Sequence, residues 1–200
     1  MIDELANKNN APTIAQNGKR IAFPPTYDWR EQERVINAWR TVHDRAANLL
    51  PDLVANVGDE RYSVSFEISE RWDNSSVGMR CWAVLRSTVE VYELAPDLFQ
   101  YCRLRFVPEP NELPAWWDAR KDKSLAGLQL EMVNEYLVAL AEAKKKNAGK
   151  PSPEFYESVA GELDAIQTQI RTSGMPVVRK FSLEMYGFRN YPLGADDNAE

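Results

Sequence analysis

The chain has 200 residues, of which 44% are apolar and 27% are charged, a composition typical of a globular protein with one core. Its formal net charge is −6, which excludes a general electrostatic attraction to nucleic acid or to anionic membranes. No apolar run reaches the length of about 18 residues that a membrane span needs, and the N-terminus lacks the pattern of a secretory signal. We therefore expect a cytoplasmic protein.

The pattern along the chain predicts one domain with an extension at each end. Residues 1–22 are polar, rich in asparagine and without helical or strand periodicity, which indicates a flexible N-terminal arm. A single α+β domain is expected over residues 23–191. Residues 192–200 contain three acidic side chains and no basic one, and we expect them to form a flexible acidic tail.

The domain is predicted to begin with a helix. Asp28 is a candidate N-cap because Glu31 follows three positions later and apolar residues then recur at helical spacing as far as Leu53. Pro51 is expected to break or kink this helix. From Arg61 the apolar period changes to two, which predicts a half-buried strand with these inward residues: Tyr62, Val64, Phe66 and Ile68.

Two more strands are expected after a turn at residues 72–76. Residues 79–91 keep one parity throughout and predict a single long strand with these apolar positions: Met79, Cys81, Ala83, Leu85, Val89 and Val91. Residues 101–106 predict a third strand, which completes an antiparallel meander.

Helical periodicity returns in the second half of the chain. One helix is predicted from Leu125 towards Lys144–Lys146, and another begins at the Ser152 and Pro153 cap and ends at Gly174. Alternation over residues 177–186 predicts a final strand. The expected fold class is thus α+β, a three-stranded antiparallel meander plus a late C-terminal strand packed against three helices, in the order α-β-β-β-α-α-β.

The outward positions of this meander gather cations and aromatic rings on one sheet face. The candidate binding residues are Arg80, Trp82, Arg86, Tyr101, Arg103 and Arg105. Exposed rings can stack nucleic-acid bases at about 1–3 kcal/mol each while guanidinium groups neutralise phosphates. The same residue types are also enriched where proteins bind one another.

These residues can also have a purely structural role on the sheet. The hairpin register places Glu67 opposite Arg80 and Glu90 opposite Arg103, so these arginines can be engaged in cross-strand ion pairs on an ordinary solvated or helix-covered face. Trp82 fits that explanation poorly because a large ring on a polar face needs a cover. The first helix or a ligand can supply it.

The adjacent rings of Trp116 and Trp117 form a second candidate. Neighbouring positions of a helix point about 100° apart, so both rings cannot easily enter the same core. One ring is expected either to act as a wedge between a helix and the sheet or to serve as an interface anchor.

The remaining patterns give no sign of catalysis. His43 is the only histidine and has no nucleophile or second histidine at a defined spacing. Cys81 and Cys102 fall on the apolar side of the predicted strands, and no phosphate-binding glycine loop is present. We expect no cofactor and no metal.

The sequence therefore predicts a non-enzymatic binding or adaptor protein that acts through an aromatic and basic surface. Its expected partner is another protein. Single-stranded nucleic acid, bound on the same sheet face, is the alternative, and an enzyme whose site the sequence does not reveal is the third hypothesis.

Overall fold

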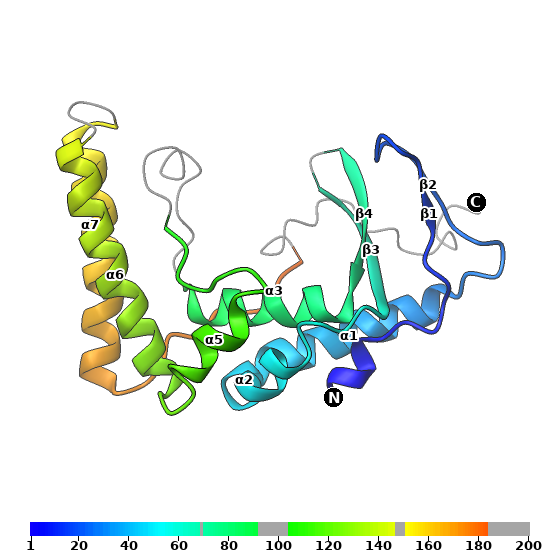
Figure 1. The fold of residues 1–200 in the computed structure, drawn as a ribbon, viewed down its shortest axis with the longest axis horizontal. Coiled ribbons are helices and arrows are strands. Elements are labelled where there is room, and N and C mark those ends of the chain that lie inside the picture. Colours follow the sequence, from blue (N-terminus) through cyan, green and yellow to red (C-terminus); the bar gives the residue numbers. More distant parts are fainter. Residues whose placement is uncertain (69, 92–103, 147–150, 184–200) are drawn as a thin grey trace, which may run out of the picture. The chain divides into compact units, whose positions relative to one another are not determined.

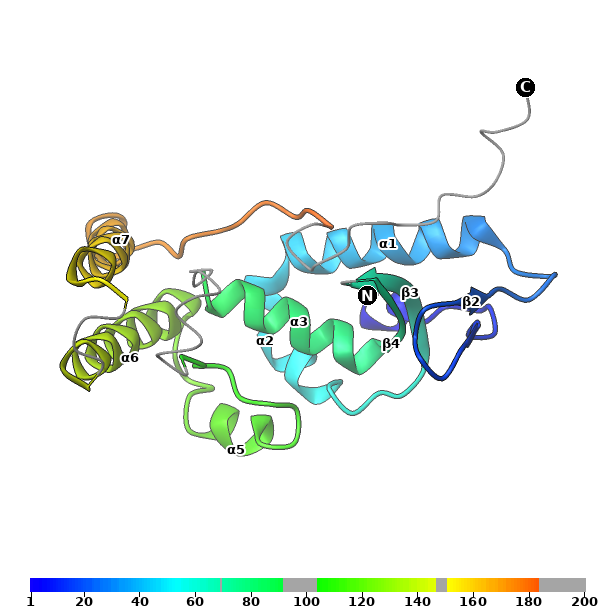
Figure 2. The ribbon, with the colours of Figure 1, turned by 90° about the horizontal axis from the view of Figure 1, so that it is seen from above.

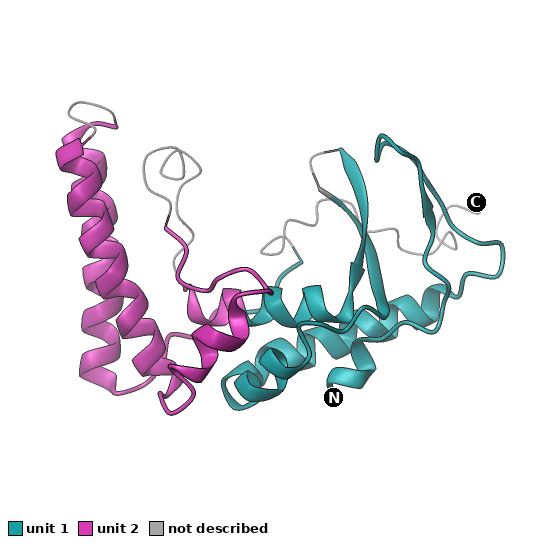
Figure 3. Ribbon diagram, in the orientation of Figure 1, with its two compact units in different colours: residues 1–85, 180–200 teal, residues 86–179 magenta. Residues whose placement is uncertain are grey.

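The chain consists of two compact units (Figure 1, Figure 3). The computed structural model describes residues 1–68, 70–91, 104–146 and 151–183. The first unit contains residues 1–85 and 180–200, and the second contains residues 86–179.

The first unit combines short hairpins with helices. Its elements are η1 (Ile2–Leu5), β1 (Thr13–Ile14), β2 (Ile21–Ala22), α1 (Trp29–Asp44), α2 (Ala46–Ala55), β3 (Tyr62–Ile68) and β4 (Arg71–Ser76). Helix α3 (Val77–Val89) begins in this unit and ends in the second. The hairpins β1–β2 and β3–β4 are separate two-stranded antiparallel sheets, and both stand on the same side of α1 in Figure 1.

Helix α1 forms where the sequence predicted it. The side chain of Asp28 accepts a hydrogen bond from the amide of Arg30 at 2.9 Å, which confirms Asp28 as the N-cap. The apolar stripe of α1 includes Val35, Trp39 and Val42, all fully buried. The predicted break at Pro51 is wrong, because the chain bends at Arg45 and the proline lies inside α2.

The first predicted strand is confirmed as β3, but its partner is different from the one expected. Residues 72–76, read as a turn, belong to β4, and Ile68 pairs with Arg71. Glu70 takes a φ of 64°, which a non-glycine residue adopts rarely and mostly in tight turns. The hairpin therefore closes earlier in the sequence than expected.

The long strand predicted over residues 79–91 is wrong, because most of this segment forms α3. Positions 81, 85 and 89 lie four residues apart, so their burial satisfies a helical period as well as a period of two. The positions that distinguish the periods favour the helix: Val84 is buried, whereas Met79 is 44% exposed. Met, Ala, Leu and Arg are also good helix formers.

The three-stranded meander and the late C-terminal strand are not present in the described residues. Residues 104–106 form no strand, and residues 101–103 lie outside the described residues. Residues 177–183 contain no strand either, and residues 184–200, including the predicted acidic tail, lie outside the described part. The structure has helices and two small antiparallel hairpins instead.

The second unit contains the end of α3, α5 (Leu113–Asp118), α6 (Leu125–Lys146) and α7 (Pro153–Ser173). Helices α6 and α7 lie side by side and run in opposite directions (Figure 1, Figure 2). Both predicted helices are confirmed. Ser152 caps α7 by accepting from the amide of Phe155, and Gly174 ends it with a φ of 67°.

Two buried polar side chains connect the elements of the second unit. The carboxylate of Glu90, 7% exposed, accepts from the amides of Phe106 and Val107 at 2.9 and 2.8 Å and from Arg86 Nε at 2.8 Å. Gln129 on α6 is fully buried. Its amide nitrogen donates to the carbonyl oxygens of Thr88 and Val177, each at 2.9 Å, and its oxygen accepts from the amide of Val177 at 2.8 Å.

Residues 1–22, expected to form an arm without regular structure, contain η1 and the β1–β2 hairpin. Ile2 and Leu5 are buried, and the amide of Asn7 donates to the carbonyl oxygen of Tyr62 at 2.8 Å. These contacts attach the segment to β3. Among the described residues, no helix has the length and apolar character needed to cross a membrane.

Candidate binding surface

The two hairpins of the first unit are joined by hydrogen bonds. The amide of Trp72 donates to the carbonyl oxygen of Gly18 at 2.8 Å, and Asn74 Nδ2 donates to the carbonyl oxygen of Pro12 at 2.8 Å. Gly18 has a φ of 71°, which glycine adopts without strain, and a Cβ there would lie 3.2 Å from Arg71 Nε. The tip of β1–β2 is thus fixed against the start of β4.

Four aromatic rings gather beside this junction. The ring centroid of Phe23 lies 4.9 Å from that of Tyr27, 4.7 Å from that of Trp29 and 6.3 Å from that of Trp72. Tyr27 is buried, whereas the other three rings are half-buried. Because the rings meet edge to face or at a tilt, they hold one another in place and still present apolar area to solvent.

A chain of hydrogen bonds supports the rings from the interior. The hydroxyl of Tyr27 bonds to Gln32 and to the hydroxyl of Tyr62, the latter at 2.8 Å. The Tyr62 hydroxyl also bonds to Ser65 Oγ at 2.8 Å, and Ser65 Oγ donates to Asn74 Oδ1 at 2.7 Å. Burial raises the pKa of Tyr62, which keeps its hydroxyl protonated and able to donate. This network connects α1 to the β3–β4 hairpin, and Asn74 extends it to Pro12 beside β1.

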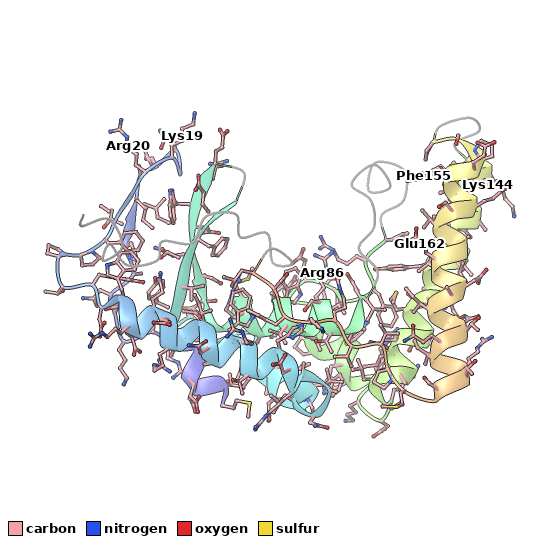
Figure 4. The ribbon with its side chains drawn as sticks, turned by 180° about the vertical axis from the view of Figure 1, so that it is seen from behind. Lys19, Arg20, Arg86, Lys144, Phe155 and Glu162 are labelled. Carbon is pink, nitrogen blue, oxygen red and sulfur yellow. The ribbon has the colours of Figure 1, made fainter. Side chains whose placement is uncertain are left out.

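Three exposed cations lie on the two hairpins that meet at this junction. Lys19 and Arg20 project from the tip of β1–β2 (Figure 4), and Arg71 is exposed on β4. None of the three forms an ion pair with another residue in the described part of the chain. By contrast, Arg61 of the same unit is paired with Asp3 at 2.9 Å and with Asp59 at 2.6 Å. The cations and the half-buried rings form what we call the hairpin surface: Lys19, Arg20, Phe23, Trp29, Arg71 and Trp72.

The predicted sheet face does not exist, because its second strand is a helix. Arg80 is only 6% exposed, and its Nε donates to Ser75 Oγ at 2.7 Å. Its guanidinium carbon lies 4.7 Å from the ring centroid of Trp39 and 5.0 Å from that of Phe66. Trp82 is half-buried on α3, and Arg86 is half-buried and paired with Glu90.

The other three residues of that face are Tyr101, Arg103 and Arg105. Tyr101 and Arg103 lie outside the described residues. Arg105 is exposed and forms an ion pair with Glu109, and it lies in the second unit. Among the described members of the predicted set, Arg80 is buried and Arg86 is paired with Glu90, so neither contributes to an exposed sheet face.

The tryptophan pair lies on α5 in the second unit. The ring of Trp116 packs edge to face on Phe106 at 5.4 Å, and the guanidinium carbon of Arg120 lies 5.1 Å from the Trp116 centroid. Arg120 is held in turn by Glu131 at 3.0 Å. Trp117 is half-buried. The ring of Trp116 therefore packs against residues of its own unit. The role of either tryptophan as an interface anchor stays a prediction.

His43 and Cys81, the residues weighed for a catalytic role, are both buried. His43 is 5% exposed, with Nδ1 3.4 Å from a carboxylate oxygen of Asp44. Cys81 is fully buried, and burial raises the pKa of its thiol to about 12. Within the described part of the chain, no three His, Cys, Asp or Glu side chains are grouped so that they could hold a metal ion.

No protein-family model matches this chain, and neither a curated protein nor a solved structure matches it. Its function has to be inferred from its own residues.

The hairpin surface was missed at the level of the sequence. The Asn17-Gly18 pair is a strong turn signal, and Phe23, Tyr27 and Trp29 lie close together in the sequence. Trp72 lies 54 positions after Gly18, however, and no local pattern indicates that the two hairpins meet.

Proposed function

We propose that the protein is a non-enzymatic binding or adaptor protein that holds a protein partner through the hairpin surface. The observation that carries this proposal is the position of three cations without an acidic partner in the described chain, Lys19, Arg20 and Arg71, beside three half-buried rings. In an acidic chain, three cations that form no ion pair in the described chain, on the same surface as apolar rings, are an unusual surface feature.

The chemistry of the surface suits a protein interface. Tryptophan and arginine are enriched among the residues that dominate binding energy, and rings that are already packed lose little conformational freedom on binding. Lys19, Arg20 and Arg71 can meet carboxylates of the partner and speed up the encounter. The hydrogen bond between Trp72 and Gly18 keeps both halves of the surface in register.

Two features favour a protein partner over single-stranded nucleic acid. Glu70 and Asp73 are exposed on either side of Arg71 and Trp72, so the surface carries both signs of charge and would repel a continuous phosphate backbone in part. The faces of the rings are partly occupied by one another, which leaves less area for stacking bases.

The experiment compares tagged full-length proteins as baits in the native host. The first variant reverses the three cations, Lys19→Glu, Arg20→Glu and Arg71→Glu. We expect wild type to capture a specific protein, identified by mass spectrometry and then purified. Calorimetry should show that the triple variant binds this purified protein more weakly by about tenfold or more.

A matched control reverses three exposed cations elsewhere, Lys145→Glu, Lys146→Glu and Arg171→Glu, so the net charge changes equally. This control should bind the partner as wild type does. Equal binding by the hairpin variant would contradict the proposal. Binding to a labelled oligothymidylate is measured as well. If this binding weakens steeply with salt and requires the three cations, single-stranded nucleic acid replaces a protein as the proposed partner.

A further inference from the structure

A ring from the C-terminal part of the chain is seated on α1. The ring centroid of Phe181 lies 5.4 Å from that of Trp39 and 5.6 Å from that of His43. The guanidinium carbon of Arg40 lies 5.6 Å from the same centroid. His43 lies four positions after Trp39 and three after Arg40, so it is the neighbour of both on the surface of α1. We call these three residues the Phe181 site.

The floor of the Phe181 site consists of buried groups with contacts of their own. Trp39 is fully buried, and the guanidinium carbon of Arg80 lies 4.7 Å from its ring centroid. Arg80 is positioned by Phe66 at 5.0 Å and by Ser75 Oγ at 2.7 Å. Since these contacts do not involve Phe181, we expect the site to keep its shape when Phe181 leaves it.

The segment that carries Phe181 has the character of a bound peptide. Residues 176–182 form neither helix nor strand, Lys180 and Ser182 are exposed, and Val178 is 69% exposed. Within the second unit, Val177 is fixed by two hydrogen bonds to Gln129, at 2.8 and 2.9 Å. Only three residues separate Val177 from Phe181, so the ring is held on a short tether.

We infer that the Phe181 site is a peptide-recognition site, filled in cis by Phe181, that accepts in trans an extended partner segment carrying a phenylalanine. The seated segment shows the chemistry: one aromatic ring between a basic and a hydroxyl residue, Lys180 and Ser182. A short tether gives an effective concentration of about millimolar, so the cis ring competes with the partner by mass action. A partner that binds displaces this segment from α1. The site uses none of the residues of the hairpin surface.

The test uses the full-length protein and a synthetic peptide with the sequence of residues 176–183, PVVRKFSL. His43 is the only histidine of the chain, so its imidazole signals in NMR report on this site alone. Phe181→Ala should bind the peptide about tenfold more tightly than wild type, because the competing ring is gone. Saturation with peptide should move the His43 signals of the variant back towards their wild-type positions.

Three controls make the result specific. Val178→Ala, on the same segment but exposed, should bind the peptide as weakly as wild type. A peptide with alanine in place of its phenylalanine should not bind Phe181→Ala. Phe181→Leu, which keeps an apolar side chain, replaces Phe181→Ala if circular dichroism shows that the alanine variant is unfolded. Equal peptide affinity for wild type and the folded variant, or no binding to that variant, would overturn the inference.

Discussion

Gly78 lies in the first turn of α3, where a Cβ would sit 2.3 Å from the carbonyl oxygen of Val57. The amide of Gly78 donates to the carbonyl oxygen of Asp59 at 2.8 Å, so the backbone cannot retreat without losing this hydrogen bond. Overpacking of this kind typically costs about 1–3 kcal/mol. We expect Gly78→Ala to lower the free energy of unfolding by about 2 kcal/mol or more, measured by urea denaturation.

Gly161 provides the matched control for that substitution. It lies inside α7, and apart from the backbone of that helix a Cβ there would meet nothing within 4 Å. Alanine is the better helix former, so Gly161→Ala should raise the free energy of unfolding by about 0.5–1 kcal/mol. If both variants lost a similar amount of stability, the contact with Val57 would not be the cause of the loss in Gly78→Ala.

Cys81 permits a test of burial by reactivity. Burial raises the pKa of its thiol to about 12, so at about pH 8 only about one part in ten thousand is the reactive thiolate. In a Cys102→Ser variant, which isolates Cys81, we expect no reaction with Ellman's reagent until the protein is unfolded in guanidinium chloride. Rapid reaction of the native variant would mean that α3 opens readily around this residue.

At the scale of elements, Glu90 connects the end of α3 to the backbone of Phe106 and Val107. Removing a buried carboxylate leaves two amides and Arg86 without their acceptor, and breaking such a pair costs about 3–5 kcal/mol. Glu90→Ala should therefore lower the free energy of unfolding by about 3 kcal/mol in a denaturant titration.

The chain contains an exposed pair with the same spacing, Arg105 and Glu109, which serves as the control. Solvent screens this pair, so Glu109→Ala should change the free energy of unfolding by less than about 1 kcal/mol. If the two alanine variants lose the same stability, burial of the carboxylate does not determine the strength of the contact.

The elements that the sequence predicts correctly are those with strong local signals. Helices α1, α6 and α7 have a long helical period, and the caps at Asp28, Ser152 and Gly174 mark their ends. The strand expected over residues 79–91 is wrong because burial at positions four apart fits a helical period as well as a period of two, and the helix propensity of the segment favours α3. Because this segment is a helix, the predicted three-stranded meander cannot form.

The hairpin surface could be predicted only in part. It combines rings and cations, but none of its residues belongs to the set that the sequence predicted. The strands β1 and β2 are too short to give a clear alternating pattern, and the contact between Gly18 and Trp72 depends on tertiary packing. Arg80 was expected at the surface because of its charge, but it is buried. The rings of Trp39 and Phe66 stabilise its guanidinium group in the interior.

At the scale of the whole molecule, each unit has its own buried core. The first is built around residues such as Trp39 and Leu53, and the second around Leu128, Met132 and Leu163. Units with separate cores can open separately, with free energies below that of global unfolding. Helix α3 passes from one unit to the other, so it is the element through which a disturbance of one unit would reach the other.

Hydrogen exchange on the two destabilised variants tests this independence. A loss of about 2 kcal/mol corresponds to about thirtyfold faster exchange of the amides that open with the affected unit. Gly78→Ala should accelerate exchange in α1 and β3 and leave α6 and α7 unchanged, whereas Glu90→Ala should do the reverse. Equal acceleration along the whole chain in both variants would contradict this independence and would show that α3 couples the two cores into one cooperative unit.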